Sequence, residues 1–439
     1  MSPFAVKAIQ LLLSLSLLIV LHELGHYIPA KIFKTRVEKF YLFFDVKFSL
    51  FKKKIGETVY GIGWLPLGGY VKIAGMIDES MDKDQMAGPP QPWEFRSKPA
   101  WQRLIIMLGG VTVNIIVGLV IYMGILYFYG RSITTNEDLP HGLAVTEQLK
   151  SSGFRDGDYV LRVDGKEVLD GLEVNRLIML RNVQTVEVRH SDGTVETLSL
   201  PENIEMDLFK VGVMIPFEPR REATVDSVIE NGPSDRAGFK VGDKVVSVNG
   251  QASEFWDEYK TLLDKNGKNE NTIVVSRNNQ LDTLRVTPDE NGMIGIVNYP
   301  RGITQTKIDY TLAESIPAGA SYGYNKLVDY AKQFKFVFTK EGATQVGGFG
   351  AIGNLFPSKW NWPVFWEMTA LISIILAFMN ILPIPALDGG HVMFLLYEIV
   401  SGRKPNDKFM EYAQMVGFFI LIALVLFANG NDIYRWLFE

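Results

Sequence analysis

Four long apolar stretches alternate with polar ones along the chain and predict membrane-spanning helices. They run from about Phe4 to Ala30, Leu104 to Gly130, Val364 to Leu382 and Tyr412 to Ala428. Helices of these lengths are about 25–40 Å long, enough to cross the roughly 30 Å hydrocarbon core of a bilayer. A cleaved signal peptide is the alternative for the first stretch, but a small-residue cleavage site is missing and the basic segment contains only Lys7. The pattern predicts a multi-pass α-helical membrane protein with four transmembrane helices.

The polar region between the second and third stretches contains an internal repeat. The segments SGFRDGDYVLRVDGKEV, Ser152–Val168, and AGFKVGDKVVSVNGQAS, Ala237–Ser253, share a glycine turn, an aspartate, an alternating apolar strand and an Asp-Gly or Asn-Gly turn. Alternation bounded by such turn residues is typical of β-strands and tight hairpins. A repeat at a fixed offset of about 85 residues defines modules. We therefore expect two tandem β-rich domains.

Basic residues predict how the chain is oriented in the membrane. They gather between the first two stretches and in the short link between the last two, at Lys31, Lys34, Arg36, Lys39, Lys52, Lys53, Lys54, Arg96, Lys98 and Arg103, and at Arg403, Lys404 and Lys408. Loops rich in Lys and Arg stay on the cytoplasmic side. The large region Arg131–Pro363 and both termini are then expected on the outer side.

Composition excludes several classes of function. The net charge of −5 leaves no general basic surface, so we expect no nucleic-acid partner. The chain has no cysteine, which excludes disulfides, thiolate metal sites and cysteine nucleophiles. It has five histidines, and two of them lie in a single motif within the first apolar stretch.

That motif is HELGH, His22 to His26. Two histidines four residues apart project from one face of a helix and can hold Zn²⁺ at about 2.0–2.1 Å, while Glu23 can act as general base. Ionisable side chains in lipid cost on the order of 2.5–3.5 kcal/mol each, and zinc binding with catalysis would account for all three. A buried polar network or an ion pathway is the alternative.

A catalytic zinc needs a third protein ligand and one open position. The segment after HELGH offers only Glu38, whereas Asp388 lies in the proline- and glycine-broken stretch Asn380–Val400. Non-helical backbone at membrane depth is tolerated only inside protein or beside a wet cavity, so Asp388 is expected to face an internal site. Two alternatives stay open: Asp388 caps a helix that starts after Gly390, or His391 is the ligand instead.

The two motifs together resemble the site-2 protease family of intramembrane zinc metalloproteases. The match is carried by His22–His26 and by Asn380–Gly389 with the sequence NILPIPALDG. The resemblance implies that His22, His26 and Asp388 bind zinc and that Glu23 is the catalytic base. The paired motifs and the tandem domains place the chain nearest the bacterial regulator-of-sigma-E protease branch.

The same resemblance implies residues that bind substrate. Asn380 would hydrogen-bond the substrate backbone, and Asn114 is retained from the family pattern although Gly-Val replaces its usual Gly-Pro. The stretch Tyr60–Ile73 resembles the family's membrane-dipping β-hairpin, with Gly61 and Gly63 in its Gly-x-Gly strand. Its glycines and alternation suit an edge strand that pairs with an unwound substrate helix.

The repeated domains resemble PDZ domains. The match is close in Asn231–Gly250, NGPSDRAGFKVGDKVVSVNG, while the first copy lacks the upstream proline. PDZ domains bind extended peptides by strand addition. The alternative roles are a size filter against bulky outer domains and a purely structural plug.

These predictions divide the chain into five parts. They are an N-terminal membrane part with a membrane-associated β-hairpin, two PDZ-like domains, an outer juxtamembrane helical segment and a C-terminal membrane part, at residues 1–130 (hairpin about 37–75), 131–217, 218–303, 304–363 and 364–439.

The predicted function is that of an intramembrane zinc endopeptidase in the bacterial inner membrane, with its PDZ-like domains and termini on the periplasmic side. Its expected partners are the lipid bilayer and single-span membrane proteins of the anti-sigma-factor type, or leftover signal peptides. The oligomeric state is not predicted. Two alternatives are a non-catalytic scaffold that binds peptides through its PDZ-like domains, and an ion or proton carrier.

Overall fold

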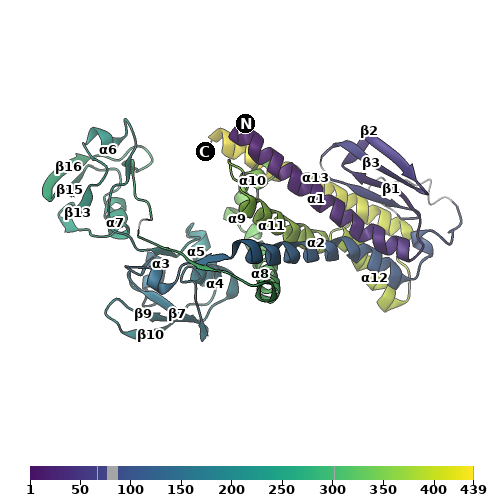
Figure 1. The fold of residues 1–439 in the computed structure, drawn as a ribbon, viewed down its shortest axis with the longest axis horizontal. Helices are drawn as coiled ribbons and strands as arrows, with labels where there is room; N and C mark the ends of the chain where they lie inside the picture. Colours follow the sequence, from purple (N-terminus) through teal and green to yellow (C-terminus); the bar gives the residue numbers. More distant parts are fainter. Residues whose placement is uncertain (67, 77–87, 301, 439) are drawn as a thin grey trace. The chain divides into compact units, whose positions relative to one another are not determined.

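The computed structural model describes residues 1–66, 68–76, 88–300 and 302–438, and it separates into two compact units (Figure 1). The helical unit comprises Met1–Gly130 and Asp309–Glu439, and the β-rich unit comprises Arg131–Ile308. The β-rich unit is therefore an insertion between the second and third long helices.

Four helices of the helical unit are long and apolar enough to cross a membrane, which confirms the four predicted spans. They are α1 (Pro3–Ile32), α2 (Ala100–Tyr129), α11 (Trp362–Ile381) and α13 (Asp407–Phe438). Ser2 caps α1 by accepting a hydrogen bond from the backbone of Ala5, and Pro3 occupies the first helical position, where a missing N–H costs nothing. Each helix exceeds its predicted apolar stretch at one or both ends.

Small residues let α1 and α2 approach closely. A Cβ on Gly25 would collide with the backbone of Gly109, and a Cβ on Gly109 would collide with that of Gly25. Glycine pairs of this kind allow backbone-to-backbone packing of membrane helices. A Cβ on Gly110 would meet both His22 and His26. The crossing therefore places the histidine face of α1 directly against α2.

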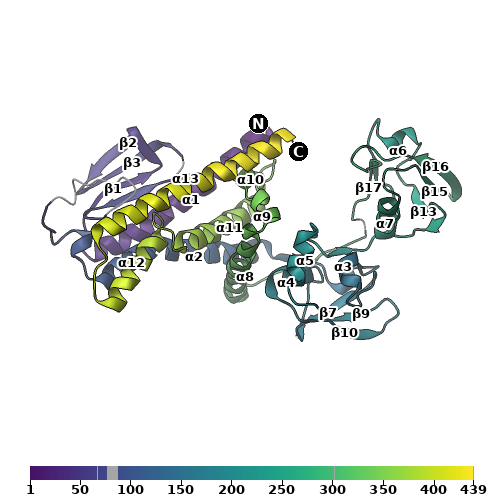
Figure 2. The same cartoon turned by 180° about the vertical axis from the view of Figure 1, so that it is seen from behind.

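Shorter helices complete the helical unit. They are α8 (Leu312–Gln333), α9 (Lys340–Gln345), α10 (Phe349–Asn354) and α12 (Asp388–Ser401), with short 3₁₀ turns at Phe95–Ser97 and Phe334–Phe338. Helix α8 packs against α2, and the two helices lie next to each other in both views (Figures 1 and 2). Gly319 and Gly323 allow this contact, since a Cβ on either would meet α2.

The predicted hairpin is part of a four-stranded sheet. Its strands are β1 (Val37–Leu42), β2 (Phe44–Ile55), β3 (Thr58–Leu65) and β4 (Tyr70–Ile73), in the order β2-β3-β1-β4. Strands β2 and β3 form the antiparallel hairpin, β1 and β3 are parallel, and within the described residues β4 pairs only with β1. The edges are therefore β2 and β4; Leu67, between β3 and β4, lies outside the described residues.

The expectation that the Gly-x-Gly strand is an edge strand is wrong. Gly61 is paired with Lys52 of β2 on one side and with Tyr41 of β1 on the other. The ring of Tyr41 fills the space that a side chain at position 61 would occupy. The glycine thus accommodates a neighbouring aromatic ring inside the sheet, a use of glycine that the strand pattern alone does not reveal.

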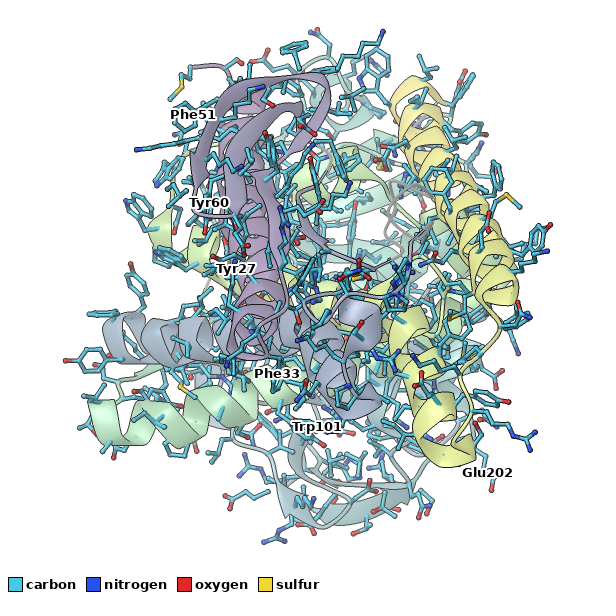
Figure 3. The ribbon with its side chains drawn as sticks, turned by 90° about the vertical axis from the view of Figure 1, so that its right-hand side faces the viewer. Tyr27, Phe33, Phe51, Tyr60, Trp101 and Glu202 are labelled. Carbon is cyan, nitrogen blue, oxygen red and sulfur yellow. The ribbon has the colours of Figure 1, made fainter. Side chains whose placement is uncertain are left out.

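Aromatic side chains join this sheet to α1. Tyr27 of α1 and Tyr60 of β3 point toward one another, and their hydroxyl oxygens are 2.6 Å apart (Figure 3). Phe33 and Trp101 meet edge to face with ring centroids 5.4 Å apart. The tyrosine contact fixes the sheet beside the end of α1 that carries the HELGH motif, and the Phe33–Trp101 contact joins the same end to α2.

The β-rich unit contains two modules with the same strand order. In the first, β10 (Val195–Ser199), β9 (Thr185–Arg189), β7 (Tyr159–Val163) and β8 (Lys166–Glu167) lie side by side. In the second, β16 (Gln280–Val286), β15 (Asn271–Arg277), β13 (Lys244–Val248) and β14 (Gln251–Ala252) do so. The sequence repeat therefore corresponds to a structural repeat.

Short elements complete both modules. The first adds β6 (Leu143–Val145), α3 (Glu147–Lys150), α4 (Glu173–Arg181), α5 (Ile204–Lys210) and β11 (Phe217–Pro219). The second adds β12 (Ser227–Val228), α6 (Pro233–Arg236), α7 (Trp256–Asn266) and β17 (Ile296–Val297). Two further strands, β5 (Arg131–Ile133) and β18 (Thr306–Ile308), pair where the chain enters and leaves the unit.

The two modules differ in the partner of one buried aspartate. Asp158 and Asp243 occupy equivalent places just before β7 and β13, and their exposed fractions are 0% and 1%. Asp158 is 2.7 Å from the Nδ1 atom of His190, whereas Asp243 accepts two hydrogen bonds of 2.7 Å from Arg277. Buried carboxylates need such partners because desolvation of an unpaired charge is costly.

Candidate active site

Three side chains from distant parts of the sequence meet inside the helical unit. The Nε2 atoms of His22 and His26 are each 3.3 Å from Oδ2 of Asp388, and the two nitrogen atoms are 3.3 Å from each other. Among the described residues, this is the one group of three or more His, Cys, Asp or Glu side chains that could hold a metal ion.

Regular helix geometry positions the two histidines. They lie one turn apart on α1, with His26 buried and His22 at the edge of the cluster. The Nδ1 atom of His26 is 2.8 Å from the backbone carbonyl of Ile106 on α2. A carbonyl can only accept, so Nδ1 of His26 carries the proton and its Nε2 lone pair faces the cluster.

An asparagine holds the other histidine. The side-chain amide nitrogen of Asn114 on α2 lies 3.1 Å from Nδ1 of His22, and Asn114 is fully buried. In the described part of the chain, Oδ1 of Asn114 has no hydrogen-bond partner. An amide can present either its oxygen or its nitrogen to a ring nitrogen, and only the oxygen can accept a proton from Nδ1–H.

Packing rather than helix geometry positions Asp388. Helix α11 ends at Ile381, and the chain turns sharply before α12 begins at Asp388, with Ala386 in the left-handed region at φ 85°. A Cβ on Gly389 would meet the backbone of Ile381 and Leu382, so only glycine allows this tight closure. Gly417 of α13 packs against the backbone of Pro385 in the same way.

The two alternatives for this stretch are not supported by the geometry. Helix α12 begins at Asp388 itself and its cap position is Leu387, so the expectation of a helix that starts after Gly390 is wrong. The Nε2 atom of His391 lies 2.8 Å from the amide of Gln414 on α13, outside the three-residue cluster.

The cluster fits a zinc ion. Around a tetrahedral centre with bonds of 2.0–2.1 Å, neighbouring ligand atoms lie about 3.3–3.4 Å apart, which matches the three separations of 3.3 Å. Oδ2 of Asp388 is buried and lacks a hydrogen bond from any described residue. Three lone pairs directed at one point repel unless a cation or protons lie between them. Two imidazoles and a carboxylate form a normal zinc donor set.

Glu23 lies beside this cluster and contacts the sheet. Its exposed fraction is 9%, and the backbone of Val71 in β4 lies beside its carboxylate. A Cβ on Gly69, just before β4, would come within 3.7 Å of Glu23. Sequence reasoning missed Val71 and Gly69 as neighbours of the site; the Gly-Gly pair before Tyr70 was the only signal, and it did not indicate a partner.

The predicted substrate-binding residues divide into two groups. Asn380, at the end of α11, places its amide nitrogen 3.4 Å from Nε2 of His22 and therefore joins the cluster, as does Asn114. Gly61 and Gly63 instead contact Tyr41 and the backbone of Phe43 and Phe44 within the sheet. Strand β4, by contrast, packs against α1, and the backbone of its Val71 lies beside Glu23.

An ion pair fixes α12 against α2. A guanidinium nitrogen of Arg103 lies 2.5 Å from a carboxylate oxygen of Glu398, and both side chains are largely buried. Charge-assisted hydrogen bonds of this length are strong. Because α12 also carries Asp388 at its first position, the ion pair connects the helix of the third candidate ligand to the helix that carries Asn114.

Comparisons with known proteins agree over nearly the whole chain. The model of the family described as peptidase family M50 matches residues 10–424. The chain is 26% identical over 449 residues to the regulator of sigma E protease of Haemophilus influenzae, covering 97% of this chain and 98% of that protein. It is 24% identical over 453 residues to the metalloprotease MmpA of Caulobacter vibrioides, covering 99% and 97%. A protein of Neisseria meningitidis whose name classes it as a zinc metalloprotease is 25% identical over 449 residues, covering 96% and 97%.

Proposed function

The chain belongs to peptidase family M50, and on that premise we propose that it hydrolyses peptide bonds within the membrane at the centre formed by His22, His26 and Asp388. Family membership and relatives named as zinc metalloproteases and as a regulator of sigma E protease make it a zinc-dependent protease of the membrane. The observation that carries the assignment to these residues is the set of three 3.3 Å separations around an unpartnered carboxylate oxygen.

Each side chain at the centre has a distinct role in this proposal. His22, His26 and Asp388 hold the zinc ion, which supplies Lewis-acid polarisation of water and of the scissile carbonyl. Glu23 takes a proton from the attacking water and passes it to the leaving amine. Burial keeps bulk water from competing for its carboxylate, beside which the backbone of Val71 in β4 lies.

Asn114 supports the centre rather than the substrate. Its amide contacts the ring nitrogen of His22 that faces away from Asp388, and it is fully buried. With its oxygen toward Nδ1–H, Asn114 keeps Nε2 of His22 unprotonated, as the carbonyl of Ile106 does for His26. The amide of Asn380 faces the cluster directly, which supports its role in hydrogen bonding the substrate backbone.

The free edge of β4 is the proposed substrate-binding edge. Among the described residues, strand β4 pairs with β1 on one side only, and its Val71 lies beside Glu23. An unwound substrate segment that adds to this edge would present its backbone to the base. Extension is required because a helical peptide bond is shielded and already hydrogen-bonded.

The remaining details of the proposal follow from the sequence pattern. The sheet β1–β4 is membrane-associated, the two modules are PDZ domains, and they lie with both termini on the periplasmic side of a bacterial inner membrane. Its substrates are single-span membrane proteins of the anti-sigma-factor type or leftover signal peptides. The relative named regulator of sigma E protease supports this class of substrate. A non-catalytic scaffold would have no need for the assembled cluster with Glu23 beside it.

The decisive experiment separates zinc binding from catalysis. Purified Glu23→Gln protein in nanodiscs is expected to retain one zinc ion per chain by elemental analysis and to lose cleavage of a transmembrane substrate. Glu290→Gln, at an exposed site of the β-rich unit, is the matched control and should cleave normally. Normal cleavage by Glu23→Gln, or wild-type protein without zinc, would contradict the proposal.

A further inference from the structure

The edge strand β2 changes character along its length. Its first half exposes three apolar side chains, with exposed fractions of 50% for Val46, 57% for Phe48 and 66% for Leu50, and one lysine among them, Lys47. Its second half exposes three consecutive lysines, Lys52 to Lys54, which we call the lysine edge. Exposed apolar patches on a protein mark an interaction surface, and here the patch is continuous with a cationic one.

The sheet register places the two halves at different levels relative to α1. Helix α1 ends at Ile32 and β1 starts at Val37, so the start of β1 lies near the basic end of α1. Lys54 pairs with Val59, which pairs in turn with Lys39 near the start of β1. The lysine edge therefore lies at the level of the end of α1, and the apolar half extends away from that level.

This direction matches the layers of a bilayer. The basic end of α1 is the proposed cytoplasmic end, because lysines and arginines mark that side. A rise of about 3.3 Å per residue separates Leu50 from Lys54 by roughly 13 Å, about the step from acyl chains to headgroups. Phe48 stacks on Trp64, whose indole nitrogen donates to the carbonyl of Val46, so the apolar half ends in a rigid aromatic pair.

The lysine edge has no acidic partner in the described structure. Lys39 and Lys72 of the same sheet pair with Asp45 and Glu38, but no ion pair or hydrogen bond joins Lys52, Lys53 or Lys54 to a described residue. Successive strand residues point to opposite faces, so the three ammonium groups surround the open edge of β2.

We propose that the lysine edge binds the phosphate groups of anionic phospholipids in the cytoplasmic leaflet while Phe48, Leu50 and Trp64 insert among the acyl chains. An acidic protein partner would account for the lysines alone, whereas a lipid accounts for both halves of the strand. Each lysine near an anionic surface strengthens binding by about five-fold. The lipid contact would set the depth of the sheet and hence the place of β4 beside Glu23.

This inference rests on the proposed membrane association of the sheet, and one experiment tests both separately. The chain has no cysteine, so a single Leu50→Cys substitution allows one fluorescent label on the full-length protein. The labelled protein is placed in nanodiscs that contain either brominated phosphatidylglycerol or brominated phosphatidylcholine at equal total composition. Bromine quenches the label only where the brominated lipid lies beside it.

We expect brominated phosphatidylglycerol to quench at least about three-fold more than brominated phosphatidylcholine, given the per-lysine effect above. The variant K52Q/K53Q/K54Q should lose this preference while both lipids still quench, and the charge-matched control K240Q/K265Q/K268Q, exposed in the β-rich unit, should keep it. Equal quenching in the wild type, or a preference that survives in K52Q/K53Q/K54Q, would overturn lipid selectivity and leave membrane association standing. No quenching by either lipid would overturn both.

Discussion

The two halves of the proposed zinc centre are built in different ways. His22 and His26 owe their spacing to one turn of a regular helix, and one partner on α2 holds each ring. Asp388 owes its position to a sharp non-helical turn that two glycine contacts and an ion pair keep in place. The histidine half is thus a local property of the chain, whereas the aspartate half depends on tertiary packing. Substitutions far from all three donors should therefore weaken the second half selectively.

Removal of a donor from either half should have the largest effect. We expect His26→Ala and Asp388→Ala each to reduce bound zinc below stoichiometry and to abolish cleavage, a loss beyond the about 10–100-fold that changes around a metal ligand produce. Elemental analysis and cleavage of a transmembrane substrate measure both. Zinc retained by Asp388→Ala at the wild-type level would show that the aspartate half is dispensable.

The next largest effect is expected from a substitution in α13, which packs against the turn before Asp388. The side chain introduced by Gly417→Val would clash with the backbone of Pro385, so the turn must shift to accommodate it. We expect zinc affinity to fall about 10–100-fold, as for other changes that move a ligand. Gly430→Val on the same helix is the matched control, because a Cβ at Gly430 meets no atom within 4 Å. Equal zinc affinity in both variants, measured by competition with a chelating dye, would remove the contrast between the two halves.

A smaller effect is expected at the histidine half. With the amide oriented as proposed, Asn114→Leu removes the acceptor for His22 Nδ1–H but leaves the helix spacing intact, so zinc affinity should fall by about 10-fold. Asn114→Asp keeps an oxygen acceptor and should recover most of that loss. A role in substrate binding alone would instead raise KM in Asn114→Leu and leave zinc affinity unchanged.

The smallest effect on zinc should follow loss of the ion pair. Glu398 lies ten residues beyond Asp388 on α12, or about 15 Å along the helix. Glu398→Gln leaves Arg103 largely buried without its partner, so we expect a lower melting temperature and a change in zinc affinity of less than about three-fold. Thermal unfolding in detergent and dye competition measure the two quantities. A zinc loss as large as that of Gly417→Val would mean that the whole of α12, rather than its first turn, positions Asp388.

Sequence patterns predicted the features whose cause is local. Hydrophobic length predicted four spans, and the repeat predicted two modules whose strand orders match. The pattern of two histidines on one helix face needed no tertiary information, and the broken stretch at Asp388 was recognisable because irregular backbone in a membrane needs a reason.

The sequence did not predict features that depend on contacts between segments far apart in the chain. Nothing in the segment Tyr60–Ile73 indicates that β1 inserts between β3 and β4, since strand patterns describe faces and not neighbours. The position of Val71 beside Glu23 and the ion pair of Arg103 with Glu398 arise from the same long-range packing. Asn114 was recognisable as a site residue, but its position against Nδ1 of His22 required the helix crossing at Gly25 and Gly109.

The buried aspartates Asp158 and Asp243 have different partners, so the stability of the two modules should depend differently on pH. Burial alone would lower the pKa of His190, but hydrogen bonds to Asp158 and Glu196 outweigh it and raise that pKa above its usual 6.5. In the folded first module, His190 therefore binds its proton more tightly than it does in the unfolded chain. Protonated His190 stabilises the folded module fully below about pH 6.5. This stabilisation declines as the pH rises through the raised pKa of His190. Arg277 stays charged throughout this range, so the second module lacks this dependence. Alkaline conditions should thus loosen one module while its structural twin keeps its ion pair, which hydrogen exchange at pH 6 and pH 9 would detect.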